Sequence, residues 1–185
     1  MSRDTGRKID LTTPVEKLTA AQKTTIILHA LHKYFSHWRR QRRYVVFPEL
    51  RLGSGFSGTA QRRIDFFVIS TCAGNETIAF EIKTSKKDFR RDIENDLKQR
   101  GARLYANKFY YITPKGLLSA EDKKQIPVWA GLIEYDIEKN RKCYKNVYFE
   151  VPIPAPLHAK AMPSWGLICA ITRKVKRING YDEEN

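Results

Sequence analysis

Three ionisable side chains lie within two segments that otherwise resemble buried β-strands. Asp65 is in RRIDFFVIS, and Glu81 and Lys83 are in TIAFEIKTS. Ionisable groups are rarely buried without a partner, because removing a charge from water is costly. Side chains alternate along a strand, so Glu81 and Lys83 point to the same face, about 6.6 Å apart along it. If the strand that carries Asp65 pairs alongside, all three side chains share one small site.

The two carboxylates indicate a divalent cation. Neighbouring carboxylates repel each other and tend to take up a proton unless a cation neutralises them. Mg²⁺ and Mn²⁺ prefer such oxygen ligands and complete their coordination with water and substrate phosphate. A metal of this kind polarises a phosphoryl oxygen and activates a bound water, which a lysine orients or deprotonates. The predicted chemistry is phosphodiester hydrolysis, with Asp65 and Glu81 as catalytic metal ligands and Lys83 as a catalytic residue.

The composition favours a polyanionic partner. The 185-residue chain has 34 Lys and Arg against 20 Asp and Glu, a net charge of +14, and such a surface attracts nucleic acid. The sequence has no apolar run of the roughly 18 residues that a membrane span needs, and its beginning is too polar for a secretory signal. The three cysteines are too scattered for a disulfide framework. We therefore expect a cytoplasmic protein that associates with the nucleoid through DNA, without a membrane partner.

Hydrophobic periodicity predicts an α/β fold in which one mixed sheet is flanked by helices. The two β-branched and aromatic runs at 64–71 and 77–84 are typical of a hairpin. We expect a flexible arm at 1–17, a single domain at 18–178 and a tail at 179–185. The expected helices are 19–39, 86–105, 119–124 and 165–176, and the expected strands are 44–50, 64–71, 77–84, 109–113, 129–136 and 143–151.

Asp65, followed after fifteen residues by Glu81-Ile82-Lys83, looks like the PD-(D/E)xK nuclease motif, with Ile64 in place of its proline. The longer text FEIKTSKKDFRRD, with FYYITP and IPVWAGLIEYD downstream, is similar to the MmcB-like DNA-repair nucleases of that superfamily. The resemblance covers residues 45–136. It implies a restriction-endonuclease-like core and a Mg²⁺- or Mn²⁺-dependent deoxyribonuclease that acts in DNA repair or processing.

Two further features follow from this resemblance. Related families often add an upstream acidic residue, and VVFPEL places Glu49 where a further catalytic metal or water ligand would be expected. The alternative is that Glu49 is a solvent-exposed strand end. Some relatives also carry a Gln and a Tyr four residues apart on the following helix. Here Gln99 and Tyr105 are six apart, which departs from that pattern.

A basic surface is expected to contact the DNA backbone, since phosphate contacts supply affinity that does not depend on sequence. The alternative is an ordinary solvated face. Asp88 and Asp92 are expected to cap the start of the helix at 86–105 and to pair with its basic groups. The glycine-rich segment 53–58 is read either as a flap over DNA or as a plain connection. The expected DNA-binding residues are Arg62, Arg63, Lys86, Lys87, Arg90, Arg91, Lys98 and Arg103.

Three other readings stay open. The three ionisable side chains could be an ion-pair ladder on a solvated sheet face. The chain could be a DNA-binding module that has lost turnover, or its basic surface could bind RNA, although few aromatic residues occur in a basic context. The sequence also leaves open the oligomeric state, a homodimer included.

Overall fold

The computed structural model describes residues 13–37, 40, 43–52, 63–72, 74–95, 99–142 and 147–178. Within them, six strands form one mixed sheet in the order β1-β2-β3-β4-β5-β6. The first three strands are antiparallel neighbours, β3, β4 and β5 run parallel, and β6 returns antiparallel at the edge. The predicted α/β class is confirmed. The strands are β1 (Tyr44–Arg51), β2 (Arg63–Ser70), β3 (Thr77–Ile82), β4 (Lys108–Pro114), β5 (Gly131–Tyr135) and β6 (Glu150–Ile153).

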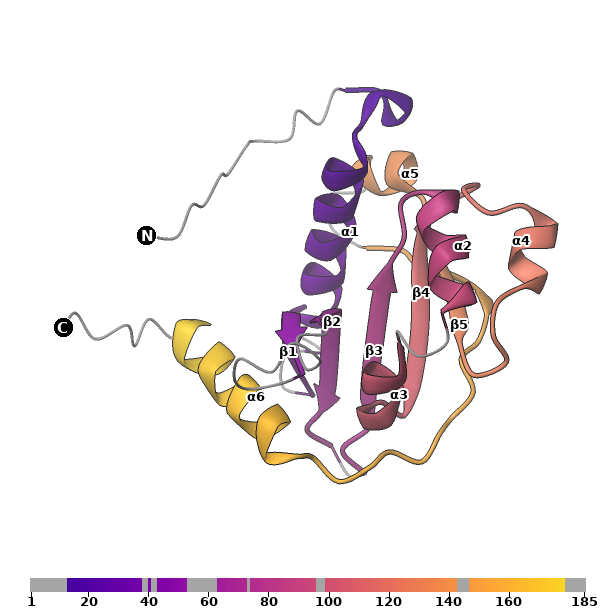
Figure 1. The fold of residues 1–185 in the computed structure, drawn as a ribbon. Coiled ribbons are helices and arrows are strands. Elements are labelled where there is room, and N and C mark those ends of the chain that lie inside the picture. The colour runs from indigo at the N-terminus through magenta and orange to yellow at the C-terminus, as the bar shows by residue number, and fades with distance from the viewer. Residues whose placement is uncertain are drawn as a thin grey trace.

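Helices cover both faces of the sheet, because alternate residues of its buried strands are apolar on each side. Phe66, Phe80 and Ile112 point to the face covered by α1 (Ala20–Phe35) and α5 (Ile137–Arg141). The opposite face carries the site described below. Phe67, Ala79 and Tyr111 belong to the core cluster on that side. The helices that cover it (Figure 1) are α2 (Lys86–Glu94), α3 (Arg100–Tyr105) and α6 (Trp165–Ile178).

Helix α1 begins and ends within the predicted range. Thr19 caps its start, and Gln22 completes a capping box that satisfies exposed backbone N–H groups. Residues 13–17, at the end of the predicted arm, contact the folded part of the chain. Val15–Lys17 form a 3-10 turn, and the guanidinium of Arg141 donates to the carbonyl of Thr13 at 2.6 Å. This start of the described chain therefore packs on α5, which the hydrophobic pattern did not predict. Residues 1–12 and 179–185 lie outside the described residues.

The single helix predicted at 86–105 is wrong, because the structure has two. Helix α2 ends at Glu94, and Asn95 follows with φ −108° and ψ 78°, outside the helical region. Asparagine has a low helix propensity, because its side chain competes for backbone hydrogen bonds. Helix α3 starts after Gln99. The break separates the two helices and, as shown below, allows the Gln99 side chain to turn toward α2.

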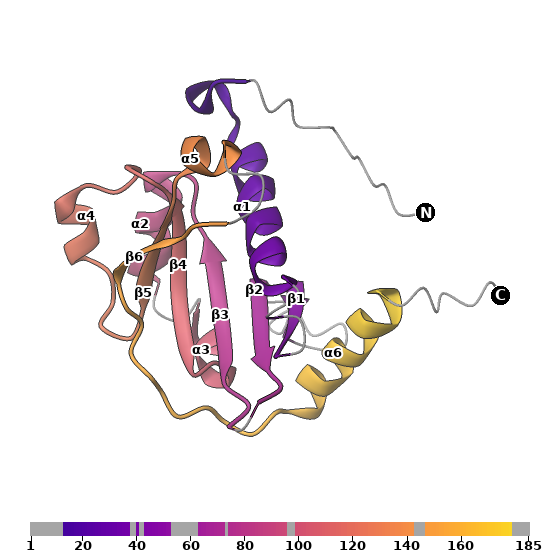
Figure 2. The same cartoon turned by 180° about the vertical axis from the view of Figure 1, so that it is seen from behind.

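The far edge of the sheet, nearest the viewer in Figure 2, also differs from expectation. A strand was predicted at 143–151, but β6 covers Glu150–Ile153. It includes Pro152, which an edge strand tolerates because one side of its backbone has no sheet partner. Helix α4 (Ala120–Lys124) forms as predicted, with a capping box between Ser119 and Asp122. None of the helices in the described part of the chain combines the length and apolar character that a bilayer span requires.

Candidate active site

Asp65 lies across from Glu81 in the sheet. Strands β2 and β3 are antiparallel, with Phe66 paired to Phe80, so the next position places the two carboxylates on the same face. Oδ2 of Asp65 accepts the backbone N–H of Ile82 at 3.0 Å. The strand pattern predicted this proximity. The side-chain bond to Ile82 also explains how the position of Asp65 is fixed where the regular ladder ends.

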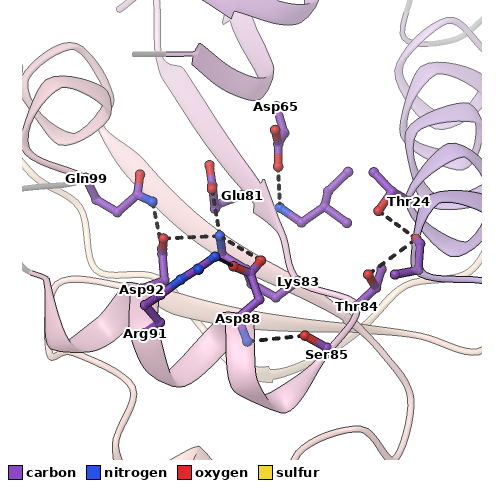
Figure 3. Close-up of polar contacts among 12 residues, drawn as sticks. Thr24, Asp65, Glu81, Lys83, Thr84, Ser85, Asp88, Arg91, Asp92 and Gln99 are labelled. Carbon is purple, nitrogen blue, oxygen red and sulfur yellow. Dashed lines mark hydrogen bonds and ion pairs between the residues drawn. The ribbon is translucent and has the colours of Figure 1, made fainter. Parts of the chain in front are cut away.

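Lys83 lies at the centre of a cluster of carboxylates (Figure 3). Its Nζ is 2.9 Å from Oε1 of Glu81, 3.1 Å from Oδ1 of Asp92 and 3.5 Å from Oδ2 of Asp88. The side chain is only 3% exposed. An ammonium has three N–H donors and no acceptor, so this set of oxygens suits its protonated form. The reading of these residues as a solvated ladder therefore does not describe Lys83, which is buried.

Helix α2 brings its two aspartates to Lys83. Ser85 caps the helix by accepting the N–H of Asp88 at 3.2 Å, and the buried ring of Phe89 anchors the helix to the core. Asp92, three residues later on the same helical face, is therefore directed inward. Its Oδ2 accepts a hydrogen bond from the Gln99 amide at 2.7 Å.

The expectation that Asp88 and Asp92 cap the helix was wrong, whereas the pairing of Asp88 with a basic residue of that helix is confirmed. Asp88 pairs with Arg91 at 2.7 Å, as predicted, but Ser85 rather than an aspartate caps the helix. Asp92 is almost fully buried, and its Oδ1 lies 3.1 Å from Nζ of Lys83. The spacing from Phe89 was a usable signal for this inward orientation, since residues three apart share a helical face.

The pKa values of the cluster reflect burial and mutual charge. Burial, followed by the negative charge of Asp65, raises the pKa of Glu81 to about 7. Burial also raises the pKa of Asp65, although the Ile82 N–H and the charge of Lys83 oppose this. For Lys83, burial alone would lower the pKa, but the carboxylates of Glu81, Asp92 and Asp88 raise it above its ordinary value. Lys83 is therefore an ammonium at neutral pH.

Glu49 lies on β1, the neighbour of β2 on the side away from β3 and Glu81. In the β1–β2 register, Pro48 pairs with Phe66 and Leu50 with Ile64, which places Glu49 across from Asp65. Glu49 has a positive φ of 53°, an uncommon conformation for a residue other than glycine.

Arg63 lies between the carboxylates of Glu49 on β1 and Asp65 on β2. Its guanidinium lies 2.9 Å from the Glu49 carboxylate and 3.8 Å from that of Asp65. Glu49 is half exposed, at 50%, so the predicted upstream acid is adjacent to the site and held there by an arginine.

The residues of the site fit a cation that takes few protein ligands. Burial, followed by the charge of Asp65, raises the pKa of Glu81 to about 7, and a cation beside the two carboxylates would favour their charged forms. Among the described residues, Oε2 of Glu81 makes no hydrogen bond or ion pair. No group of three or more His, Cys, Asp or Glu in that part of the chain is arranged to hold a metal. The two neighbouring carboxylates of Asp65 and Glu81 are donors of the type that Mg²⁺ and Mn²⁺ take, since these ions commonly bind one or two carboxylates and otherwise water and phosphate.

The predicted DNA-binding residues differ in their surroundings. Arg90 donates twice to the buried Asp122 of α4, at 2.8 and 3.1 Å, and Lys86 is 3.4 Å from the same carboxylate. The guanidinium of Arg103 stacks 4.1 Å from the ring centroid of Trp129. These three side chains have partners within the protein.

Lys86 and Arg90 remain 46% and 55% exposed despite these partners, and other predicted contacts are exposed as well. Lys87 is exposed, and the Arg91 side chain is 74% exposed although it pairs with Asp88. Arg63 is half exposed beside the carboxylates. Arg62, Lys98 and the segment 53–58 lie outside the described residues.

No family model matches the chain, and no curated protein has a significantly similar sequence. The solved structure of a protein of unknown function from Silicibacter pomeroyi is similar in fold, with a TM-score of 0.55 and 16% sequence identity. The alignment covers 91% of this chain and 97% of that one. A likeness at this identity shows a shared fold alone, so any function assigned to this chain depends on its own residues.

Proposed function

We propose that this protein is a Mg²⁺- or Mn²⁺-dependent nuclease that hydrolyses DNA phosphodiester bonds, in DNA repair or processing. The observation that carries the proposal is the placement of Asp65, Glu81 and Lys83 on one face of two adjacent strands. The sequence resemblance to PD-(D/E)xK nucleases assigns function to these same three positions. The net charge of +14 favours a polyanionic substrate.

Each residue has a distinct part in the proposed reaction. Asp65 and Glu81 would hold the cation, which when bound supplies charge stabilisation for the phosphoryl oxygens and a water of lowered pKa. Lys83 stays protonated and holds Oε1 of Glu81, which keeps that carboxylate turned to a single orientation. Its positive charge also offsets the negative charge that develops on the phosphate. Glu49 is a further candidate ligand, for which Arg63 would have to release it.

The DNA would approach where cationic side chains point to solvent. Lys87 and Arg91 lie on α2, the helix that contributes Asp88 and Asp92 to the site. Their contacts would be with phosphates and would not depend on sequence. This arrangement supports binding of the backbone close to the proposed metal ligands.

The direct test uses purified protein with labelled single-stranded DNA, duplex DNA and RNA, each with Mn²⁺, with Mg²⁺ and with EDTA. We expect products from a DNA substrate only when a divalent cation is present. Products from RNA alone would contradict the proposal and favour an RNA enzyme. Absence of products from every substrate, with DNA bound, would favour the second candidate below.

A catalytically inactive DNA-binding module is the second candidate, and one observation favours it. Lys83 is buried and its ammonium is surrounded by Glu81, Asp92 and Asp88. Such a cluster is also what a purely structural ion-pair network looks like. The presence of both Asp65 and Glu81, with an elevated pKa at Glu81, favours the enzyme.

A further inference from the structure

We propose that Asp92, oriented by Gln99, is a positioning residue that holds the ammonium of Lys83 against Glu81. The consequence for cleavage rests on the proposed function, whereas the positioning itself does not. Neither the resemblance nor the predicted site residues assigned this role to Asp92. The relevant chain of contacts runs from the Gln99 amide to Asp92 at 2.7 Å, and from Asp92 to Lys83 at 3.1 Å. It ends at Glu81, 2.9 Å from the ammonium.

Lys83 needs such a partner because its side chain is long. Four rotatable bonds carry the ammonium, and the rotamer entropy of this flexible side chain opposes any single position. Glu81 is two residues away on the same strand and supplies one oxygen. A second, independently anchored carboxylate fixes the ammonium from the helix side of the site, as Figure 3 shows for Asp92.

The two aspartates of α2 are not equivalent in this respect. Asp88 is partly exposed, lies 3.5 Å from Lys83 and also binds the exposed Arg91 at 2.7 Å. Asp92 has a fully buried side chain and a closer contact. Buried polar contacts are stronger than exposed ones because water does not screen them. Asp92 therefore determines where the ammonium lies, and Asp88 adds a weaker attraction.

One substitution breaks this series of contacts and keeps the shape of the side chain at position 92. In Asp92→Asn, one oxygen and one NH₂ group replace the two acceptors, yet both Lys83 and Gln99 are donors. The new NH₂ group must then face either the Lys83 ammonium or the Gln99 NH₂, and two donors cannot hydrogen-bond to each other. Adding Gln99→Glu restores the pattern, because the new carboxylate accepts from the amide, whose oxygen then faces Lys83. The double variant is a rescue that a general loss of packing would not allow.

Asp122→Asn is the matched control. Asp122 is also a buried aspartate, bonded to Arg90 and to Ser119, but it has no contact with Lys83. Its substitution removes the charge of another buried aspartate, whose partner Arg90 is 55% exposed, and tests whether destabilisation alone explains an effect. Thermal unfolding of all variants shows which of them remain folded at the assay temperature.

The deciding readout is the ¹H–¹⁵N signal of the Lys83 ammonium, identified by its disappearance in Lys83→Arg. A buried, hydrogen-bonded ammonium exchanges slowly enough with water to be seen. We expect the signal in the parent, in Asp122→Asn and in the double variant, and its loss in Asp92→Asn. An unchanged signal in Asp92→Asn would overturn the inference, whatever the activity.

Cleavage provides the second readout. In single-turnover reactions at saturating protein, Asp92→Asn should cleave about 10- to 100-fold more slowly, the range for groups that orient the ligands of a metal site. DNA affinity should stay unchanged, and the double variant should recover part of the rate. A parent protein that cleaves nothing would refute the proposed function, while the ammonium signal would still decide the role of Asp92.

Discussion

The carboxylate of Asp65 accepts the backbone N–H of Ile82, the residue between Glu81 and Lys83, at 3.0 Å. This bond ties β2 to the end of β3 through a side chain and fixes the separation of the two candidate metal ligands. An asparagine at position 65 can make the same bond through its carbonyl oxygen. Asp65→Asn therefore removes the charge and keeps the geometry.

The two arginines of α2 should respond differently to substitution. Arg91→Ala should weaken DNA binding similarly for all sequences and reduce the slope of log K against log salt by up to ~0.9 for the lost phosphate contact. Arg90→Ala should instead lower the free energy of unfolding, because it leaves the buried Asp122 with fewer partners. Anisotropy at several salt concentrations and urea unfolding measure the two effects. A salt slope that falls for Arg90→Ala and stays constant for Arg91→Ala would contradict this assignment.

Lys83→Met should destabilise the protein strongly. The substitution leaves Glu81 and Asp92 buried without their cation, and breaking a buried ion pair by removing one partner costs about 3–5 kcal/mol. The free energy of unfolding that Lys83→Met loses relative to the parent should be smaller at pH 6 than at pH 8. Carboxyl groups whose folded pKa is raised bind protons in the folded state, so lower pH favours folding.

Urea unfolding of Lys83→Met and of the parent at both pH values measures this difference. Lys87→Met is the control, because Lys87 is exposed on the adjacent helix and should change stability by less than about 0.5 kcal/mol. Equal losses for the two variants would show that Lys83 is not the cation of a buried network.

The affinity for Mn²⁺ should depend on pH through Glu81. Its pKa of about 7 in the folded protein means that protons compete with the cation below that value, since a ligand must be deprotonated to bind. Affinity should fall about tenfold per pH unit below 7 and change little above it. Titration calorimetry at pH 6, 7 and 8 tests this, with Glu81→Gln expected to lose both the affinity and its pH dependence. An affinity that is flat from pH 6 to pH 8 would exclude Glu81 as a ligand with a raised pKa.

Strand alternation was enough to predict that Asp65, Glu81 and Lys83 share one face. The period of two fixes which side chains point together, and the hairpin pattern at 64–71 and 77–84 predicted the correct antiparallel pairing. These are local relationships within about twenty residues. Hydrophobic periodicity likewise predicted one mixed sheet with flanking helices, but it merged α2 and α3 into one helix and placed the last strand at 143–151 instead of Glu150–Ile153.

The burial of charge could not be predicted from the same patterns. The basic residues around Asp92 suggested a surface for DNA contact, with a solvated face as the alternative, yet Asp92 itself is buried beside Lys83. Likewise, no local pattern predicted that Arg90, an expected DNA contact, also binds a buried acid 32 residues away. These ion pairs depend on tertiary contacts between α2 and elements distant in the sequence. Helical spacing predicts only that a residue faces inward, and it does not identify the residue that it contacts. Asn95 was the local signal for the break between α2 and α3.

The most direct test of the nuclease assignment is single-turnover cleavage of labelled DNA in Mn²⁺ by the parent, Asp65→Asn and Glu81→Gln, each shown to be folded. We expect the parent to cleave only with the cation present, and both variants to lose cleavage while still binding DNA, because they lose the charge that would hold the cation. Cleavage by either variant at the parent rate would contradict the account.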